Sequence, residues 1–169
     1  MSASGAEVKQ LGLGYYWQDL AVGQKFKTYR RTVTEADLVG FINCTGMLEV
    51  IFMDAEYSAT HGAVAGRIVP GALTYSLIEG MLFQTMMQGT GLAMLETSMK
   101  AVAPVFVDDA IYGVVEVIGI KPTSKHGRAV LASRVTVKNQ DNETVMTYDV
   151  SRLVAGWETE NKAESSLAR

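Results

Sequence analysis

The stretch Ile68–Gly89, IVPGALTYSLIEGMLFQTMMQG, predicts one long helix around which the rest of the chain folds. Pro70 suits the first turn of a helix, where its missing N–H costs no hydrogen bond. No further proline interrupts residues 72–88, and apolar residues fall on every face, which is typical of a buried helix. A helix of ~17 residues is ~25 Å long, and its interspersed polar side chains do not suit a membrane span. We expect Gly89 to end it.

Segments on both sides of this helix predict strands and shorter helices. Before it, we expect a strand over Gln24–Val33, a helix over 35–44 that follows the N-cap Thr34, and a short helix over Asp54–Thr60. After it, turn residues separate β-rich segments at Leu92–Ala103, Ala110–Lys121, Arg128–Lys138 and Thr144–Val154. The pattern predicts an α+β fold in which one antiparallel β-sheet wraps around the long helix. An open edge strand and an uncovered helix side favour a dimer with a continuous sheet.

Length, charge and cysteine content narrow the class of protein. With 169 residues, the chain can bury one core without disulfides. The net charge of −3 and the lack of a Lys/Arg cluster argue against a nucleic-acid partner. The single Cys44 fits a reducing compartment, and the N-terminus lacks an apolar signal segment, so we expect a cytoplasmic protein with no membrane partner.

The composition also predicts whether the chain binds a metal or cofactor and which segments fold. His61, His126 and Cys44 cannot form a zinc site of the usual nitrogen and sulfur type, and we expect neither metal nor cofactor. We expect a flexible N-terminus over 1–10, a single domain over 11–157 and a flexible charged tail over 158–169.

Several short segments, taken in their order and spacing, resemble a known family. They are Asp19–Phe26 (DLAVGQKF), Thr32–Asp37 (TVTEAD), Phe41, Gly66–Gly71 (GRIVPG), Ser76–Leu77, Ala103–Phe106 (APVF), Asp109 and Asn139–Gln140. Together they are similar to the MaoC-like hydratases of the hot-dog superfamily, which includes (R)-specific enoyl-CoA hydratases. The resemblance implies a hot-dog fold, a homodimer or dimer of dimers, and an acyl-CoA or acyl-carrier-protein thioester as partner. The reaction that it implies is hydration of a trans-2-enoyl thioester, or the reverse dehydration.

The chain departs from this family where the family carries its acid and base. The family pattern D-x-N-P-x-H follows the first helix, and the matching segment here, from residue 47, reads M-L-E-V-I-F. Met47 stands at the Asp position, Glu49 at the Asn position and Phe52 at the His position. Neither Met47 nor Phe52 can transfer a proton. The resemblance still implies that the Gly71 N–H donates to the thioester carbonyl, and that Met47, Glu49, Phe52 and Ser76 lie in the substrate-binding site.

Glu79 is the remaining candidate for chemistry. A carboxylate within an otherwise apolar helix is costly to bury unless it is paired, hydrogen-bonded or protonated. Related hot-dog dehydratases carry a catalytic carboxylate on this helix, at the position of Ser76, and a His ahead of a Pro-Gly pair, which His61 resembles. Glu49, in the segment that replaces the family's pair, stays a further candidate. Two interpretations of Glu79 and His61 stay open. Glu79 and His61 form an acid–base pair, or Glu79 pairs with a basic or hydroxyl partner across the dimer while His61 is solvated.

Three functions follow from these interpretations. The chain is a hydratase or dehydratase with a relocated acid–base pair, a thioesterase in which Glu79 activates water, or a subunit that binds an acyl thioester without catalysis. Methionines such as Met81, Met86 and Met94 favour a pliable apolar lining for an acyl group, although most are expected to pack in the core.

Overall fold

The computed structural model describes residues 10–125 and 127–157. The flexible ends expected over 1–10 and 158–169 lie outside these residues, apart from Gln10, and so does His126. In chain order the elements are a 3-10 helix η1 (Trp17–Asp19), β1 (Lys25–Lys27), β2 (Arg31–Thr32), α1 (Glu35–Thr45), α2 (Val50–Met53), α3 (Ala55–His61), α4 (Gly71–Thr85), β3 (Gly91–Ala101), β4 (Ala110–Pro122), β5 (Ala129–Lys138) and β6 (Thr144–Val154).

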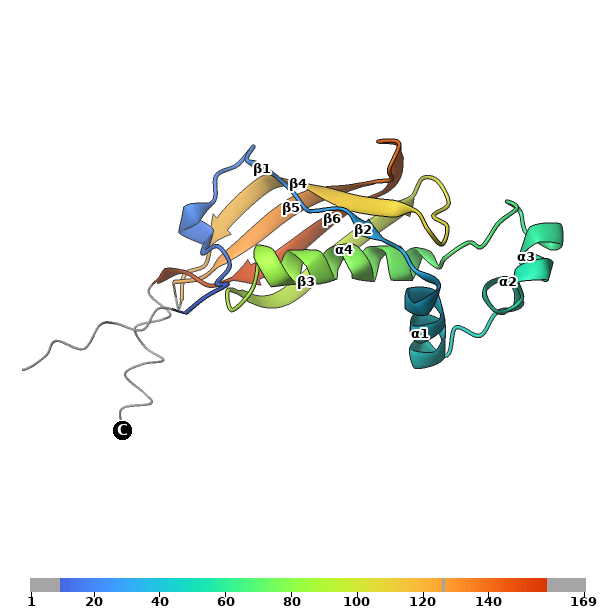
Figure 1. Ribbon diagram of the computed structural model, residues 1–169. Coiled ribbons are helices and arrows are strands. Elements are labelled where there is room, and N and C mark those ends of the chain that lie inside the picture. Colours follow the sequence, from blue (N-terminus) through green and yellow to red (C-terminus); the bar gives the residue numbers. More distant parts are fainter. Residues whose placement is uncertain (1–9, 126, 158–169) are drawn as a thin grey trace, which may run out of the picture.

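The strands form an antiparallel sheet in the order β1-β4-β5-β6-β3, and β2 also pairs with β4. The α4 helix lies along one face of this sheet, while α1, α2 and α3 gather beyond one end of it (Figure 1). The expected α+β arrangement of one antiparallel sheet and one long helix is therefore confirmed. The four strands after α4 agree with the predicted segments to within two residues at each end.

The single strand predicted over Gln24–Val33 is wrong in its middle, because β1 and β2 are separate. Lys27 pairs with Val114, and Arg31 pairs with Ile111. Between these two pairs, the segment that joins β1 to β2 contains one residue more than the facing part of β4. The extra residue makes a bulge, which Thr28 stabilises. Its N–H donates to the Gly113 carbonyl and its Oγ1 accepts from the Gly113 N–H, both at 2.9 Å.

The helices α1 and α3 begin at the expected N-cap residues, whereas α2 (Val50–Met53) was not predicted. At the start of α1, Thr34 Oγ1 accepts from the Asp37 N–H at 3.2 Å, and Asp37 Oδ2 accepts from the Thr34 N–H at 2.9 Å. Gly46, with φ +71°, ends this helix in the left-handed conformation. The Asp54 side chain accepts from the first backbone N–H groups of α3, so the short helix predicted over Asp54–Thr60 is confirmed.

The long helix is shorter and less enclosed than the sequence predicted. Pro70 precedes it as the N-cap, and Thr85 is its last residue, so Gly89 belongs to the following turn. The side toward the sheet is buried and includes Leu73, Leu77, Ile78 and Leu82. The expectation of burial on every face is wrong for the single chain, because the sheet covers one side. Ser76 is exposed on the other side, and Phe83 is 48% exposed.

A buried ion pair joins α4 to the middle of the sheet. Arg152 Nη2 donates to both oxygens of Glu79, at 2.6 and 2.5 Å, and the Tyr148 hydroxyl donates to Glu79 Oε1 at 2.7 Å. Glu79 is 6% exposed and Arg152 is 2% exposed. Arg152 and Tyr148 are four residues apart on β6 and therefore share its inner face. Burial, reinforced by the charge of Glu79, raises the pKa of Tyr148 far above its usual range, which keeps its hydroxyl a donor.

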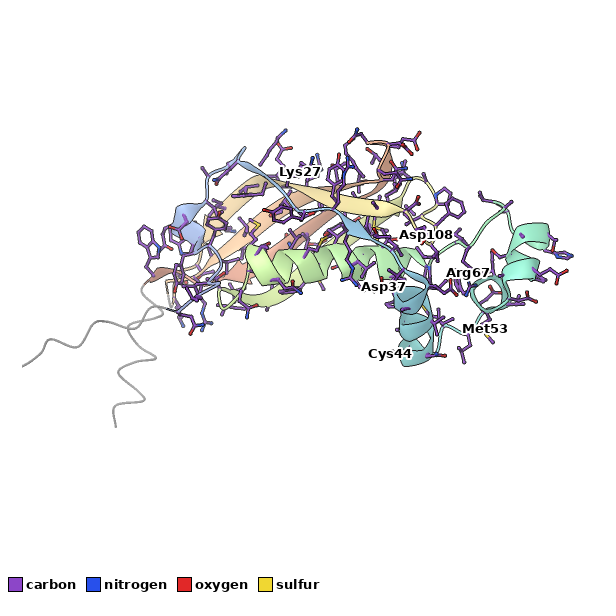
Figure 2. All side chains as sticks on the ribbon, viewed as in Figure 1. Lys27, Asp37, Cys44, Met53, Arg67 and Asp108 are labelled. Carbon is purple, nitrogen blue, oxygen red and sulfur yellow. The ribbon has the colours of Figure 1, made fainter. Side chains whose placement is uncertain are left out.

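A second ion pair fastens the segment 46–67, here called the arm, which carries α2 and α3. Arg67 lies between α1 and α2 (Figure 2). It donates through Nη2 and Nε to the Glu35 carboxylate of α1, at 2.6 and 3.1 Å, and through Nη1 to the Phe52 carbonyl of α2. Arg67 therefore holds α1 and α2 together. Its hydrogen bond lowers the pKa of Glu35, although partial burial opposes this shift.

We expect the Glu79–Arg152 pair to be strongly coupled. Replacing either residue alone, as Glu79→Leu or Arg152→Leu, leaves a buried charge without its partner and should cost about 3–5 kcal/mol of unfolding free energy. The double variant should be much more stable than the sum of the single effects predicts, because no unpaired charge remains. Urea unfolding measures all three. Arg134→Leu, which removes an exposed pair with Asp149, serves as control and should cost about 0–1 kcal/mol. Additive single effects would contradict the coupling.

The Glu35–Arg67 ion pair that fastens the arm should weaken in acid. The Glu35 pKa is lowered in the folded chain from its usual 4.5, so the stability that its ion pair contributes is complete above pH 4.5 and is lost as the pH falls through the lower folded pKa. Amide exchange, corrected for the intrinsic rate at each pH, should show loss of protection in the arm below that pH while β5 and β6 stay protected. Arg67→Ala should produce the same loss at neutral pH, and Lys25→Ala should not. An arm equally protected throughout would contradict this role.

Candidate functional site

A cavity of about 300 Å³ opens at the N-terminus of α4. Its walls come from residues just before and within the first turn of the helix, from the segment 101–105 after β3, and from the start of β6. Apart from backbone groups and Thr74, the lining is apolar, as is common in small-molecule sites. Gly71, the residue for which the sequence predicted contact with a thioester carbonyl, lies in this lining.

The first backbone donors of α4 are unused at this cavity. The N–H groups of Leu73 and Thr74 both donate to the Pro70 carbonyl, at 2.9 and 3.2 Å. The N–H groups of Gly71 and Ala72 donate no hydrogen bond to any residue in the described part of the chain. Unpaired N–H groups at a helix N-terminus favour a negatively charged oxygen, because the helix dipole adds to their own. The arrangement can therefore stabilise a carbonyl oxygen on which charge develops.

Packing within the chain does not require glycine at position 71. A Cβ built there would approach nothing more closely than the Met146 methyl group, at 3.7 Å, which is an ordinary contact. The backbone of Gly71 is also outside the left-handed region that favours glycine. Gly71 therefore lines the cavity without a packing or backbone requirement for glycine.

The arm residues expected to contact substrate do not lie at the Gly71 cavity of the single chain. Met47 is exposed, and Glu49 accepts from the Ile51 N–H at 2.9 Å as the N-cap of α2. Phe52 is partly buried against the core, and its carbonyl accepts from Arg67. None of the three arm residues predicted to bind substrate lines the cavity at Gly71. Their substrate-binding roles stay predictions.

His61 and Glu79 are not brought together. His61 lies at the exposed end of α3, where Nδ1 is 2.7 Å from Thr60 Oγ1 and the ring stacks on Tyr57 at 4.8 Å. The Glu79 carboxylate instead contacts Arg152 and Tyr148, within its own chain. The expected basic and hydroxyl partners thus exist, but the expectation that they come from across the dimer is wrong.

Ser76 also has its hydroxyl engaged locally. It is exposed on the outer side of α4, and its Oγ donates to the Ala72 carbonyl one turn earlier, at 2.8 Å. Ser76 does not line the cavity at Gly71. The predicted role of Ser76 in substrate binding therefore stays a prediction.

Sequence reasoning did not identify Arg152 as the partner of Glu79, although the pattern of β6 carries a signal. Alternate residues along β6 from Met146 to Val154 are buried, and Arg152 falls in this alternation with Tyr148 and Val150. Because side chains alternate between the faces of a strand, the period of two places Arg152 inward. A buried Arg requires a counter-charge. Glu79 is the buried acid on the facing helix.

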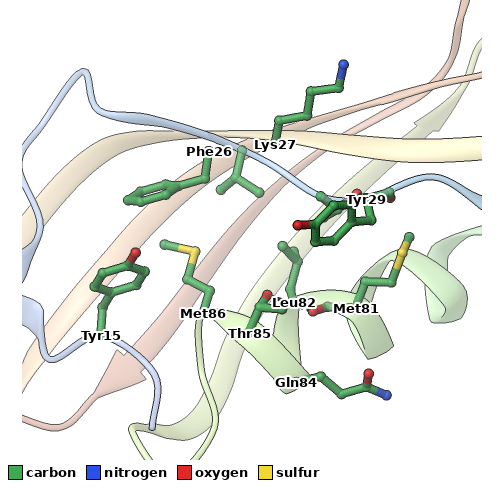
Figure 3. Close-up of a pocket in the computed structure, with 11 residues that line it drawn as sticks. Tyr15, Phe26, Lys27, Tyr29, Met81, Leu82, Gln84, Thr85 and Met86 are labelled. Carbon is green, nitrogen blue, oxygen red and sulfur yellow. Dashed lines mark hydrogen bonds between the residues drawn. The ribbon is translucent and has the colours of Figure 1, made fainter. Parts of the chain in front are cut away.

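A second cavity, of about 350 Å³, lies near the C-terminal end of α4 (Figure 3). Phe26, Leu82 and Met86 contribute apolar lining, and Tyr15 packs beside Phe26 with ring centroids 5.3 Å apart. Lys27 borders this cavity, but its ammonium lies 4.4 Å from the centroid of the Tyr112 ring. The cavity can therefore take up apolar groups, and no proton-transfer pair faces it.

Within residues 10–125 and 127–157, no group of three or more His, Cys, Asp or Glu side chains is placed to hold a metal ion. No helix in these two segments is both long enough and apolar enough to cross a membrane.

Comparisons with known proteins support the fold described above and identify the family. The family described as "MaoC like domain" matches residues 18–141. The R-hydratase PhaJ1 from Pseudomonas aeruginosa is 25% identical, with a TM-score of 0.70 over 83% of this chain and 86% of that chain. The (R)-hydratase of A. caviae involved in PHA biosynthesis is 25% identical, with a TM-score of 0.66 over 82% and 98%.

A Mycobacterium tuberculosis protein with a double hot-dog fold shares the architecture at 17% identity, with a TM-score of 0.78 over 88% of this chain and 46% of that chain. A search of curated proteins gives no match. The family match spans well over half of the chain, and the sheet and helix α4 have the arrangement of the hot-dog fold. The chain therefore belongs to the MaoC-like hydratase and dehydratase family, and it has the family's hot-dog fold.

Proposed function

We propose that this chain binds an acyl thioester, of CoA or of an acyl carrier protein, and does not hydrate it. The observation that carries the proposal is the cavity at Gly71, where unused backbone donors meet apolar walls. The donors suit the thioester carbonyl, and the walls suit the adjoining acyl carbons. Met47 and Phe52 stand where the family has its Asp and His, so the binding part of the site is retained without the acid and base.

The surroundings of Glu79 support binding without catalysis. Hydration requires groups that transfer protons beside the double bond. Both Glu79 oxygens already accept hydrogen bonds from Arg152, and the pair is closed from solvent. His61 is held on the exposed side of α3. A hydratase or a thioesterase that used Glu79 would first have to separate it from a buried counter-charge, which is energetically costly.

We also propose that two chains associate through β3. This strand pairs with β6 on one side and, among the described strands, with none on the other. Leu92, Leu95 and Met99 are about half exposed along it, and Phe83 of α4 is exposed nearby. A long apolar edge strand is prone to pair with another chain. A second copy at this edge would extend the sheet and cover the open side of α4. Separately, we propose a cytoplasmic location, which the single Cys44 favours.

Gly71→Ala tests the binding site. The added methyl group obstructs the donors, so the affinity for crotonyl-CoA or a longer enoyl-CoA should fall about tenfold or more, the equivalent of losing about 1.4 kcal/mol of binding free energy. Folding should be preserved, because alanine is the better helix former and the space exists. Calorimetry measures the affinity. Gly80→Ala is the matched control, since a Cβ at this other α4 glycine meets no atom within 4 Å, and its binding should be unchanged.

The same preparations test for catalysis. With enoyl-CoAs of several chain lengths, the absorbance of the enoyl thioester should not change beyond the rate in buffer, and no free thiol should appear. Any turnover above the rate in buffer would overturn the proposal, and its loss in a folded Glu79→Gln or His61→Ala chain would establish a relocated acid–base pair. The absence of binding to any thioester of CoA or carrier protein would also overturn it.

The proposed dimer has its own test. Light scattering should give twice the chain mass of 18.3 kDa. Leu95→Asp introduces a charge on β3 that would meet the other chain, so the mass should fall toward that of one chain. Val22→Asp places the same charge at a position that is 64% exposed and away from β3, and its mass should not change. A monomeric parent chain would contradict the dimer.

A further inference from the structure

The cavity of about 350 Å³ near the C-terminal end of α4 lies on the β1 side of the helix. Its lining comes from the N-terminal segment, from β1 and the bulge after it, from β4 and from the end of α4, and none of the described β3 residues takes part. The strands β1 and β3 stand at opposite ends of the order β1-β4-β5-β6-β3. The opening of this cavity therefore does not depend on whether two chains associate through β3.

Backbone contacts hold the walls of this cavity in place. The Gly14 N–H donates to the Gln88 carbonyl at 2.7 Å, and the Tyr15 N–H donates to the Met86 carbonyl at 2.9 Å, which fixes Tyr15 in the wall. A Cβ at Gly14 would lie 2.5 Å from the Met86 carbonyl oxygen, so only glycine permits this close approach. The bulge at Thr28 forms another part of the wall, and bulges are common beside functional sites.

The floor and the mouth of the cavity differ in polarity. Phe26, Leu82 and Met86 make an apolar floor, and the Met86 thioether can adapt to a flexible chain (Figure 3). At the mouth, Tyr29 is 91% exposed, and the Lys27 side chain is directed out of the cavity. The volume falls within the range of small-molecule sites, about 300–1,000 Å³. The cavity therefore suits an apolar body whose polar end stays in water.

The charges at the mouth decide which polar end fits. Lys27 Nζ and the Arg30 guanidinium carbon lie 4.4 and 5.5 Å from the centroid of the same Tyr112 ring. Both cations are exposed, and neither forms an ion pair within residues 10–125 and 127–157, whereas the nearby Lys25 and Arg31 each pair with an acid. Two cations held side by side without a counter-charge attract an anion and repel another cation.

We propose that this cavity binds an anionic amphiphile with a single aliphatic chain. The chain lies on the apolar floor, and the head group lies outside the mouth near Lys27 and Arg30. Fatty carboxylates and alkyl sulfates share this chemistry. Met81, in the lining, is ten residues beyond Gly71, which is about 15 Å along the helix axis, and the two cavities share no lining residue. The proposal therefore does not depend on thioester binding at Gly71.

The experiment uses the full chain at low salt and follows the methionine methyl groups by NMR. Met81 and Met86 line this cavity, and Met146 reports separately on the cavity at Gly71. Octanoate should shift Met81 and Met86 in a saturable manner. Octylammonium, which has the same chain and the opposite charge, should bind at least about threefold more weakly. Butanoate, which has the same head group, should bind at least about tenfold more weakly because it buries fewer methylene groups.

A pair of matched variants locates the chain. Thr85 and Thr45 are the last residues of α4 and α1, and each hydroxyl donates to a carbonyl one turn earlier, at 2.8 and 2.7 Å. Thr85 lines the cavity, so Thr85→Phe should fill part of it and weaken octanoate binding at least about tenfold. Thr45→Phe adds the same group away from the cavity and should bind octanoate as the parent does.

A second pair of variants locates the head group. Lys27→Gln should weaken octanoate binding about threefold, the usual size of an exposed charge contact, and should leave 1-octanol binding unchanged. Lys100→Gln removes the same charge from β3, at the other edge of the sheet, and should leave the binding of both probes unchanged. These variants change exposed side chains, so folding should be preserved.

Four results would overturn the proposal. Octanoate that shifts neither Met81 nor Met86 at millimolar concentration would show that the cavity takes up no chain. Unchanged octanoate binding in Thr85→Phe would place the chain elsewhere, and equal binding of octanoate and octylammonium would exclude selection by charge. Octanoate binding that is lost in Gly71→Ala would assign the chain to a ligand held at Gly71. Octanoate binding that persists in Gly71→Ala, while thioester binding is lost, would establish two separate sites.

Discussion

The buried contact between Glu79 and Arg152 is the constraint on which the rest of the structure depends. It joins α4 to β6 at the centre of the fold, and Tyr148 completes it with a hydroxyl donor. A buried ion pair is a weak source of net stability, since desolvation offsets much of the attraction, but removing one partner is severe. We infer that the pair acts mainly to specify how the helix lies on the sheet. It requires one rotation of α4, with Leu77 and Ile78 toward the strands.

With α4 in this position, different chemical groups are available at its two ends. At the N-terminus, the N–H groups of Gly71 and Ala72 are unused beside an apolar cavity. In the middle, the only carboxylate of the helix is already paired. At the C-terminal end, the floor of the larger cavity is apolar. One ion pair thus occupies both oxygens of Glu79, which supports the proposal that this carboxylate has no acid–base role.

The arm carries the segment in which the sequence departs from the expected family pattern. Its helices α2 and α3 are retained, and Arg67 holds them against α1 through Glu35 and the Phe52 carbonyl. This contact uses the backbone of Phe52, so the position does not need a histidine side chain to keep its place. Apolar side chains at positions 47 and 52 make the segment drier than the Asp–His pair of the family would. These features agree with the proposal of a scaffold that binds an acyl thioester without transferring protons.

The sequence by itself determined the local elements and the family. Thr34, Asp54 and the turn residues set helix and strand limits, because capping and turn formation depend on neighbours along the chain. The proton-inactive Met47 and Phe52 were also evident, since residue type alone excludes proton transfer. Only the tertiary structure decided that the sheet covers one side of α4 and that a bulge at Thr28 separates β1 from β2. It also decided that Glu79 pairs with Arg152 and not with His61. These features depend on contacts between residues distant in sequence, such as the 73 positions between Glu79 and Arg152, which local patterns do not specify.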